Sequence, residues 1–589
     1  MDWVIVAIDN NYISYPNSET YFIPGLNNGK KIVSINGSAK GSTMQNYTIE
    51  YIKHSPNSNW TLVCSSNVPK SDEKLCDWNV SNLTNGLYSL KLKVYHSGFV
   101  DEDIVTFYLD PDLKKGFPAQ LRKYYTNVKI NSKGVTIADL DNDGKFEILL
   151  AGNVLFALYC NGSNFQNFYQ CRDVKPVTPK ASNLTTNENL EVEILFGKGK
   201  GLSMLPPYDD PSSCTFLHSL WPSDSVSSIN TVNTPAVGDV DGDGDVDVVI
   251  TDDNRSVYIA SNTNLAINSK MEIPIDIIGL TAPVLQDVDG DGNPEIFVGT
   301  YNGYIYAWNF NGSVWNNLIG WPKQLGAWSV VSLAIGDIDY DGVYEIFSRA
   351  TQGNTSKIFA FHSNGSKLNE LYYIDGGEIV LGNIDNIGNM EVISATPSSW
   401  NSLTQAKIDV LYSNGSHYPG WPIYVPDKGF NVTIPVLGDV DGDGDLEIFV
   451  GVGGGLIYGW HHNGSNIEDW PKNISEAGGT YEGVCAPAIG DIDGNGRIDL
   501  IYAADDPPGN YGKVFVWEFS GYANKRVEWE SGFKNDIWNT GCYNESFIVA
   551  LLGPLNNTSN RTTYVIDFMY KPIGKNSIEN CSLIINDKI

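Results

Sequence analysis

The chain has 589 residues, enough for two or three domains, and a formal net charge of −31. This acidic balance, with no basic stripe, disfavours nucleic-acid binding, and no apolar run reaches the length of a membrane-spanning helix. Much of the acidity is local, because six short loops hold 25 of the 69 acidic residues and the other acids nearly balance the 38 bases.

The first part of the chain has the pattern of short β-strands. Residues 1–9 are expected to be the last strand of a preceding module, and residues 10–112 show short alternating runs divided by Gly, Pro and Asn turns. About 100 residues of this kind favour a β-sandwich. The segments 46–51, 59–62 and 83–90 resemble the immunoglobulin- or fibronectin-like modules of archaeal and bacterial surface proteins.

Two pairs of cysteines lie close together in the sequence. Cys64 with Cys76, and Cys160 with Cys171, would each close a short loop, so both pairs are predicted to form disulfides, with reduced thiols as the alternative. The other four cysteines cannot be paired from the sequence.

An acidic nine-residue pattern, Asp-x-Asp-x-Asp-Gly-x-x-Asp/Glu, recurs along residues 113–543. Carboxylates at positions 1, 3 and 5 can converge on one point. The Gly at position 6 permits the turn that brings the next carbonyl inward, and the acid at position 9 closes the shell. Ca²⁺ takes roughly six to eight such oxygens, whereas Mg²⁺ keeps waters and Zn²⁺ prefers His or Cys.

The pattern therefore predicts about six calcium sites, named here the first to sixth loops. Their predicted ligands are Asp139, Asp141, Asp143 and Glu147; Asp239, Asp241, Asp243 and Asp247; Asp287, Asp289, Asp291 and Glu295; Asp337, Asp339, Asp341 and Glu345; Asp439, Asp441, Asp443 and Glu447; Asp491, Asp493, Asn495 and Asp499.

A single loop of this kind could also be an ordinary solvated turn. Six near-complete copies make that alternative weak, because four unpaired carboxylates within nine residues repel one another strongly. A seventh copy, the Asn383 loop, keeps Asp385 and Glu391 but has Ile387 at position 5. It is expected to bind calcium weakly or not at all.

The loops also measure a repeat of about 50 residues, as a propeller blade requires. They start at residues 139, 239, 287, 337, 383, 439 and 491, and residues 189–197 fill the first gap as a repeat without acids. Each repeat adds an aromatic strand and an Asn-Gly hairpin, and often a Gly-Trp-Pro element. Residues 116–118, Gly-Phe-Pro, are similar to that element and are predicted to supply a strand to the last blade, near Trp529 and Trp538.

These residues resemble the FG-GAP repeat, also called the VCBS repeat, the calcium-loop blade of integrin α-chain propellers and of many bacterial and archaeal secreted proteins. The resemblance covers residues 113–543 and implies an all-β propeller with Ca²⁺ in loops on one face. Counting repeats favours eight blades, with seven as the alternative. Residues 544–589 are expected to begin another Ig-like module, so the chain is expected to be part of a longer protein.

Dense Asn-x-Ser/Thr sequons favour a secreted glycoprotein, although five of them are Asn-Gly-Ser turns that hairpins also select. No zincin, nucleophile-elbow or phosphate-loop motif is present. His461 and His462 could contact a metal or sugar, or form an exposed hairpin tip, and most of the 15 Trp residues are expected to pack in the core.

The expected function is that of a non-enzymatic, extracellular calcium-binding repeat protein. It would act in adhesion, recognition or assembly at a cell surface, with a protein or glycan partner and no direct membrane span. The alternative is a secreted carbohydrate-active enzyme, a polysaccharide lyase or glycosidase, or the accessory region of a surface protease.

Overall fold

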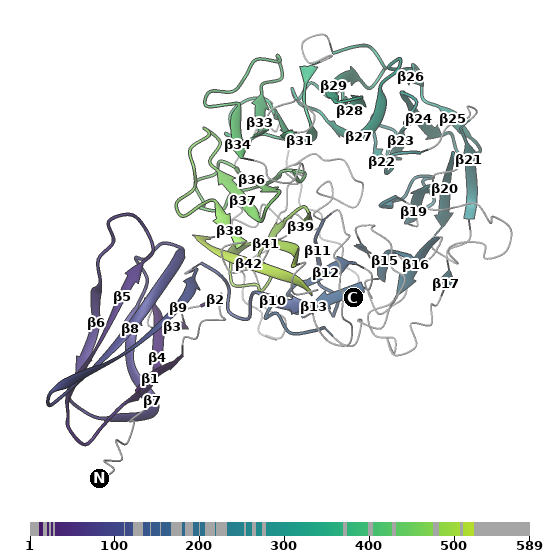
Figure 1. Ribbon diagram of the computed structural model, residues 1–589. Helices are drawn as coiled ribbons and strands as arrows, with labels where there is room; N and C mark the ends of the chain where they lie inside the picture. The colour runs from purple at the N-terminus through teal and green to yellow at the C-terminus, as the bar shows by residue number, and fades with distance from the viewer. Residues whose placement is uncertain are drawn as a thin grey trace, which may run out of the picture.

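The structure is a computed structural model in which every named element is a β-strand (Figure 1). Among the described residues, none lies in a helix long and apolar enough to cross a membrane. The described residues are 11–15, 21–22, 25–27, 30–110, 112–121, 134–141, 143–152, 155–165, 179–182, 193–198, 201–205, 218–219, 233–244, 246–252, 255–261, 267–273, 279–368, 374–398, 405–426, 432–474, 482–506 and 511–522.

Two sheets that share one core form the first part of the chain, a β-sandwich. Alternate residues of the long strands point into this core, so that Ile35, Tyr47, Ile49, Leu90 and Leu92 are fully buried. One sheet contains β1 (Tyr12–Tyr15), β3 (Gly25–Asn27), β4 (Lys30–Ala39) and β7 (Lys70–Asn79); the other contains β2 (Tyr21–Phe22), β5 (Met44–Lys53), β6 (Thr61–Ser66), β8 (Gly86–His96) and β9 (Phe99–Leu109).

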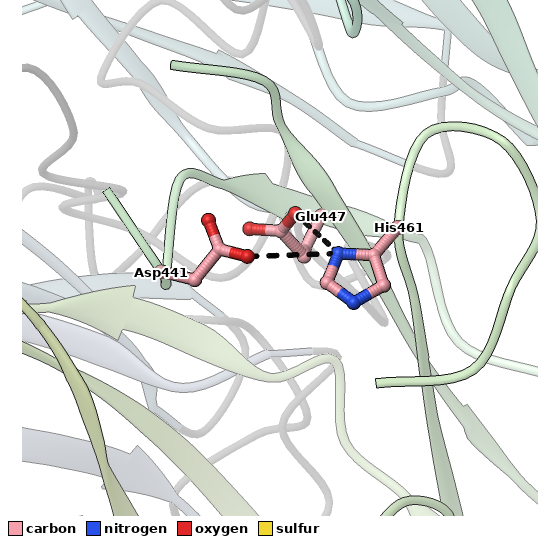
Figure 2. A group of neighbouring side chains, drawn as sticks. All are labelled: Asp441, Glu447 and His461. Carbon is pink, nitrogen blue, oxygen red and sulfur yellow. Dashed lines mark hydrogen bonds and ion pairs between the residues drawn. The ribbon is translucent and has the colours of Figure 1, made fainter. Parts of the chain in front are cut away.

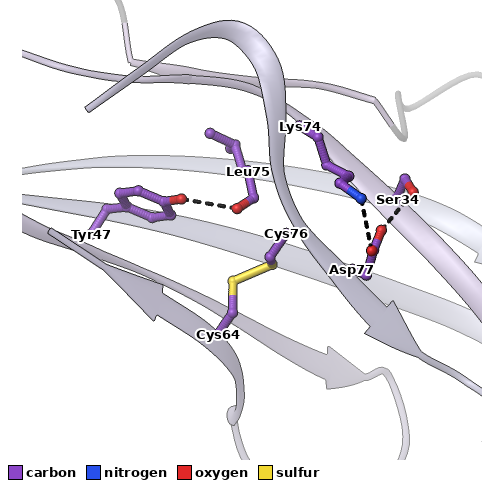
Figure 3. Close-up of a disulfide and its surroundings, with 7 residues drawn as sticks. All are labelled: Ser34, Tyr47, Cys64, Lys74, Leu75, Cys76 and Asp77. Carbon is purple, nitrogen blue, oxygen red and sulfur yellow. Dashed lines mark hydrogen bonds and ion pairs between the residues drawn. A yellow bond between two sulfur atoms is a disulfide. The ribbon is translucent and has the colours of Figure 1, made fainter. Parts of the chain in front are cut away.

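A disulfide joins the two sheets of the sandwich, as Figure 3 shows. It links Cys64 on β6 to Cys76 on β7, which confirms the first predicted pairing. Beside it, the hydroxyl of Tyr47 donates a hydrogen bond of 2.9 Å to the carbonyl of Leu75. The thiol of Cys160 is free, and Cys171, its predicted partner, lies outside the described residues, so the second pairing is not confirmed.

The remaining strands form eight small antiparallel sheets that follow one another around a ring (Figure 1). In chain order seven of them are β11 (Thr136–Ala138), β12 (Glu147–Ala151) and β13 (Leu155–Leu158); β14 (Lys180–Ser182), β15 (Glu193–Lys198), β16 (Gly201–Leu205) and β17 (His218–Ser219); β18 (Ala236–Gly238), β19 (Asp247–Thr251), β20 (Ser256–Ser261) and β21 (Ile267–Glu272); β22 (Val284–Gln286), β23 (Glu295–Gly299), β24 (Tyr304–Phe310), β25 (Trp315–Asn317) and β26 (Lys323–Gln324); β27 (Ser329–Gly336), β28 (Glu345–Gln352), β29 (Thr355–His362) and β30 (Ile374–Asp375); β31 (Glu378–Gly382), β32 (Glu391–Thr396), β33 (Gln405–Leu411) and β34 (Ile423–Pro426); β35 (Val436–Gly438), β36 (Glu447–Val452), β37 (Leu456–Trp460) and β38 (Lys472–Asn473). The eighth contains β10 (Ala119–Leu121), β39 (Glu482–Val484), β40 (Ala488–Gly490), β41 (Arg497–Asp506) and β42 (Tyr511–Tyr522).

The second strand of each acidic repeat is buried on both faces. Every residue of β23 and of β36 is buried, with no alternation of polar and apolar positions. The first strands of neighbouring sheets also contact each other, and β11 contacts both β14 and β40. Neighbouring sheets therefore pack against each other around most of the ring, which is the packing of a propeller. The predicted acid-free repeat at 189–197 contributes β15 to one of these sheets.

The start of the repeat array closes the ring. Strand β10 pairs antiparallel with β42, with Ala119 opposite Val514, which confirms the predicted contribution of the segment after residues 116–118. The Gly-Phe-Pro turn also has the packing of the Gly-Trp-Pro turns. Gly116, Gly320 and Gly420 have positive φ, and a Cβ on them would lie 2.0, 2.1 and 2.1 Å from the carbonyl oxygens of Asn161, Asn364 and Asn463. Trp529 and Trp538 lie outside the described residues.

A buried ion-pair network joins the sandwich to the ring. The ammonium of Lys472 lies 3.0 Å from Asp110 and 3.0 Å from Asp112, just after the last sandwich strand. Asp110 also accepts a hydrogen bond of 2.7 Å from the indole of Trp517 on β42, and Lys31 in the sandwich pairs with Asp112 at 2.6 Å. The segment that leaves the sandwich is therefore anchored before it reaches β10.

Candidate metal centres

Each acidic loop joins the first strand of a sheet to the second, for example β22 to β23 and β35 to β36. Since the same connection recurs in each of these sheets, the loops lie at the same end of the sheets and on one face of the ring. The position-6 glycines make the predicted sharp turn with positive φ: Gly144, Gly244, Gly292, Gly342, Gly444 and Gly496.

Backbone amides hold the aspartates of the loop in place. In the third loop the two oxygens of Asp287 accept hydrogen bonds from the amides of Gly290 and Gly292, at 2.7 and 2.9 Å. Asp289 accepts one of 3.2 Å from the amide of Asp291. In the other five loops the aspartate at position 1 also accepts two backbone hydrogen bonds, one from the glycine at position 6 and one from the residue at position 4 or 5. The loop sequence therefore positions its own carboxylates.

The acid at position 9 is buried in every loop, and it begins the second strand in all but the sixth, where β41 begins at Arg497. One of its oxygens accepts a hydrogen bond from the amide at position 2, as in Val288 to Glu295 at 2.8 Å and Val440 to Glu447 at 2.9 Å. No more than 2 % of any of these side chains is exposed: Glu147, Asp247, Glu295, Glu345, Glu391, Glu447 and Asp499.

The predicted ligands converge in the first five loops. In each, three ligand-type side chains bring one atom apiece within 4.8 Å of one another. The groups are Asp139, Asp141 and Glu147; Asp239, Asp241 and Asp243; Asp287, Asp289 and Asp291; Asp337, Asp339 and Glu345; Asp441, Glu447 and His461. These are mainly carboxylates held close together, and a hard divalent cation fits such a donor set.

Burial, and then the neighbouring aspartates, raise the pKa of the position-9 acids. The pKa rises to about 8 for Glu147 and Glu295, about 7 for Asp247 and Glu345, and about 9 for Glu447. Without a cation, burial therefore shifts these carboxyl groups toward the protonated form near neutral pH, most for Glu447 and least for Asp247 and Glu345. A bound Ca²⁺ would favour the ionised form instead and would displace that proton.

A histidine faces the position-9 acid in two loops, and neither pairing was predicted from the sequence. In the fifth loop Nδ1 of His461 lies 3.1 Å from Oε1 of Glu447 and 3.8 Å from Oδ2 of Asp441 (Figure 2). In the fourth, Nδ1 of His362 lies 3.0 Å from Glu345. The signal was the strand register, since Glu345 pairs directly with His362. His461 is thus a carboxylate partner and not an exposed hairpin tip.

Among the described residues, three pairs of neighbouring loops are joined by the same backbone hydrogen bond. The amide at position 8 of one loop donates to the carbonyl at position 2 of the adjacent loop, as Met390 does to Ile338 and Leu446 to Ile384, both at 2.8 Å. The Asn383 loop is the shared member of both bonds. Its role in the ring therefore does not depend on binding a metal.

The Asn383 loop keeps the common shape without the full ligand set. The amide of Ile387 still donates to Asn383 at 3.1 Å and to Asp385 at 2.9 Å. The hydroxyl of Tyr418 donates to the other oxygen of Asp385 at 2.9 Å. The position-3 carboxylate of this loop therefore already has a protein partner.

In the sixth loop a lysine lies among the predicted ligands. The ammonium of Lys114 is 2.7 Å from Asp493, 3.0 Å from Asp499 and 3.0 Å from Glu518. Burial would lower the pKa of Lys114, but these carboxylates raise it, so the ammonium remains charged. Sequence reasoning missed this cation because Lys114 and Asp499 are 385 positions apart.

Comparison with known proteins identifies the repeats. The FG-GAP-like repeat family matches residues 287–348 and 439–502, and each segment spans two acidic loops. The chain therefore contains FG-GAP-like repeats. No curated protein matches the sequence.

Several solved structures are similar in shape at low identity. BamB from Moraxella catarrhalis has 13% identity and a TM-score of 0.42, over 68% of this chain and 99% of its own. The V. cholerae biofilm matrix protein Bap1 has 13% identity and a TM-score of 0.38, over 69% and 91%. The WD40 domain of Toxoplasma gondii coronin has 9% identity and a TM-score of 0.35, over 71% and 90%.

Proposed function

We propose that the protein is an extracellular, calcium-stabilised propeller of eight blades that serves adhesion or assembly at a cell surface. In this proposal the FG-GAP-like repeats form the ring, an Ig-like sandwich precedes it, and Ca²⁺ fills the acidic loops on one face. The partner is a protein or a glycan, and the chain carries out no catalysis.

The observation that carries the calcium part is the recurrent, pre-formed loop with a buried acid at position 9. In the third loop Asp287, Asp289 and Asp291 approach within 4.8 Å, and Glu295 is buried beside them. Without a cation this arrangement brings the like charges of the three aspartates together and keeps the Glu295 carboxyl group out of water, and both are unfavourable. Metal binding and folding are therefore coupled.

The extracellular part has independent support. Sites built from exposed loops of Asp and Glu suit the high calcium concentration outside cells, and the disulfide between Cys64 and Cys76 suits an oxidising compartment. The dense sequons agree with a secreted glycoprotein.

The calcium part is tested by melting the purified chain in EDTA and then in millimolar Ca²⁺, with native mass spectrometry to count bound ions. We expect several bound calcium ions and a clear rise in melting temperature. An unchanged melting curve with no bound metal would refute this part.

The recognition part needs a separate experiment, because a ring can bind calcium without binding a partner. A glycan array and a cell-binding assay in Ca²⁺ should show saturable binding that EDTA abolishes. Turnover of an acidic polysaccharide in a substrate screen would instead support the enzyme alternative and contradict the proposal.

A further inference from the structure

One backbone position recurs beside the acidic loops, in most sheets just after the Asn-Gly hairpin. Its amide donates to the carbonyl of a residue on the third strand of the sheet, and that residue pairs with position 11 of the repeat on the second strand. We name it the hairpin position. It is occupied by Phe165, Leu318, Leu368, Tyr418, Ile467 and Lys114, whose amides donate to Ala157, Ala307, Ala360, Val410, Gly459 and Val516.

Lys114 belongs to this set although it precedes the whole array. Its carbonyl accepts a hydrogen bond of 3.1 Å from the amide of Phe117, just as Leu318 accepts one from Trp321 at 3.0 Å. Ring closure therefore places Lys114 in the last sheet at the position that Leu318 occupies in its own.

The type of residue at the hairpin position depends on whether the loop beside it has carboxylates at positions 1, 3, 5 and 9. The first, third, fourth and fifth loops have carboxylates at positions 1, 3, 5 and 9, and their hairpin positions are apolar: Phe165, Leu318, Leu368 and Ile467. The two loops without a carboxylate at position 5 have Ile387 and Asn495 there. Those two have Tyr418 and Lys114 at the hairpin position.

Both polar residues reach the same ligand. Tyr418 donates through its hydroxyl to Oδ2 of Asp385 at 2.9 Å, and Lys114 lies 2.7 Å from Oδ2 of Asp493. Asp385 and Asp493 are each the position-3 carboxylate of their loop. In the sixth loop the ammonium also binds the position-9 acid, Asp499, through both oxygens at 3.0 Å.

Both polar atoms of the side chain at position 5 of the sixth loop also have protein partners. Oδ1 of Asn495 accepts the amide of Arg497 at 2.8 Å, as Oδ1 of Asp291 accepts Asn293 in the third loop. The other atom of Asn495 is an amide nitrogen that donates to Glu518 at 2.8 Å. An amide nitrogen is a donor and cannot bind a cation.

We propose that the hairpin position decides which loops take calcium, and that the Lys114 ammonium replaces the ion in the sixth loop. This inference rests on the proposed calcium binding, and it revises the sixth predicted site. Tyr418 fills the corresponding place in the Asn383 loop. Because Lys114 lies between the sandwich and β10, the sixth loop binds the closing segment to the ring without metal.

Two reciprocal variants test the proposal by native mass spectrometry in Ca²⁺. Leu318→Lys installs the ammonium beside the complete third loop, and we expect one bound calcium fewer than in the original chain. Lys114→Leu combined with Asn495→Asp recreates a complete, unblocked loop, and we expect one calcium more. Equal counts in folded samples of all three proteins would overturn the proposal.

A second measurement separates this proposal from the calcium function itself and does not depend on a variant. Amine labelling of the original chain should modify Lys114 roughly tenfold or more slowly than the exposed Lys145, in EDTA and in Ca²⁺ alike. Lys114 that reacts as fast as Lys145 overturns the inference. A chain that binds no calcium but protects Lys114 refutes the calcium function and leaves the internal cation supported.

Discussion

The backbone amide of Phe146 donates a hydrogen bond of 2.9 Å to the carbonyl of Ile492. Phe146 is position 8 of the first loop and Ile492 is position 2 of the sixth. This bond, at the closure of the ring, is therefore the same kind of link that Met390 and Leu446 make between other loops. Three pairs of adjacent loops are thus joined by the same backbone hydrogen bond, one of them across the closure of the ring. A cation that holds one loop in place also holds the position-8 amide of that loop, which donates to the adjacent loop.

The raised pKa values of the position-9 acids predict how stability depends on pH without calcium. These groups keep a proton in the folded state that the unfolded chain has lost, so folded protein binds more protons above about pH 4.5. The free energy of unfolding should therefore fall as pH rises from about 5 to 8, by up to about 1 kcal/mol per pH unit for each such group. Glu147 and Glu295, with pKa about 8, contribute across most of this range.

Melting temperatures in EDTA at pH 5, 6, 7 and 8 check this trend. In excess Ca²⁺ the fall should shrink or reverse, because the ion displaces those protons and binds more tightly as pH rises. A melting temperature in EDTA that increases from pH 5 to pH 8 would contradict the assignment.

Replacing one position-3 ligand should distinguish a metal loop from the Asn383 loop. Asp289→Asn in the third loop removes a charged ligand, so we expect a smaller rise in melting temperature on adding Ca²⁺ and one weaker site by calorimetric titration. Asp385→Asn is the matched control, because Tyr418 already donates to Asp385 and the amide oxygen can still accept. Equal losses in the two variants would show that the Asn383 loop also binds calcium.

The repeat period and the acidic loops could be predicted from the sequence because both are local patterns. Position-9 burial also follows locally, since Glu295 directly begins an apolar strand. The partners of the ligands could not be predicted. His362 reaches Glu345 through strand register, and Lys114 reaches Asp499 only after the ring has closed. Contacts of that kind depend on the assembled blades and not on neighbouring residues.

Because the Gly-Trp-Pro turn lies close to the next hairpin, we predict that Gly320 does not tolerate a side chain. Gly320 has φ of +94° and a Cβ there would lie 2.1 Å from the carbonyl oxygen of Asn364. Gly326, with φ of +73° and open space around it, is the matched control. Gly326→Ala should cost about 1–2 kcal/mol from backbone strain alone. Gly320→Ala should cost about 1–3 kcal/mol more because backbone must move.

Urea denaturation of the two variants in Ca²⁺ measures the difference. Similar midpoints would mean that the turn and the Asn364 hairpin separate easily, and that the packing repeated at Gly116 and Gly420 contributes little.

The buried ammonium of Lys472 predicts a strongly destabilising substitution at the joint between sandwich and ring. Its side chain is 1 % exposed, and Lys472→Met would leave the buried Asp110 carboxylate without its ammonium, next to the indole of Trp517 and the backbone amide of Asp112. We expect a loss of about 3–5 kcal/mol, the usual result of removing one member of a buried pair. Lys31→Met removes the partly exposed partner of Asp112 and should cost no more than about 1 kcal/mol.

Denaturant unfolding, together with limited proteolysis between the sandwich and β10, measures the stability of this joint. In Lys472→Met we expect earlier cleavage near residue 112, whereas Lys31→Met should match the original chain. Adding Asp110→Asn to Lys472→Met should restore part of the stability, because the neutral amide can accept from Trp517 without a buried charge. If the double variant is no better than Lys472→Met, the loss comes from the packing of the lysine stem and not from the stranded carboxylate.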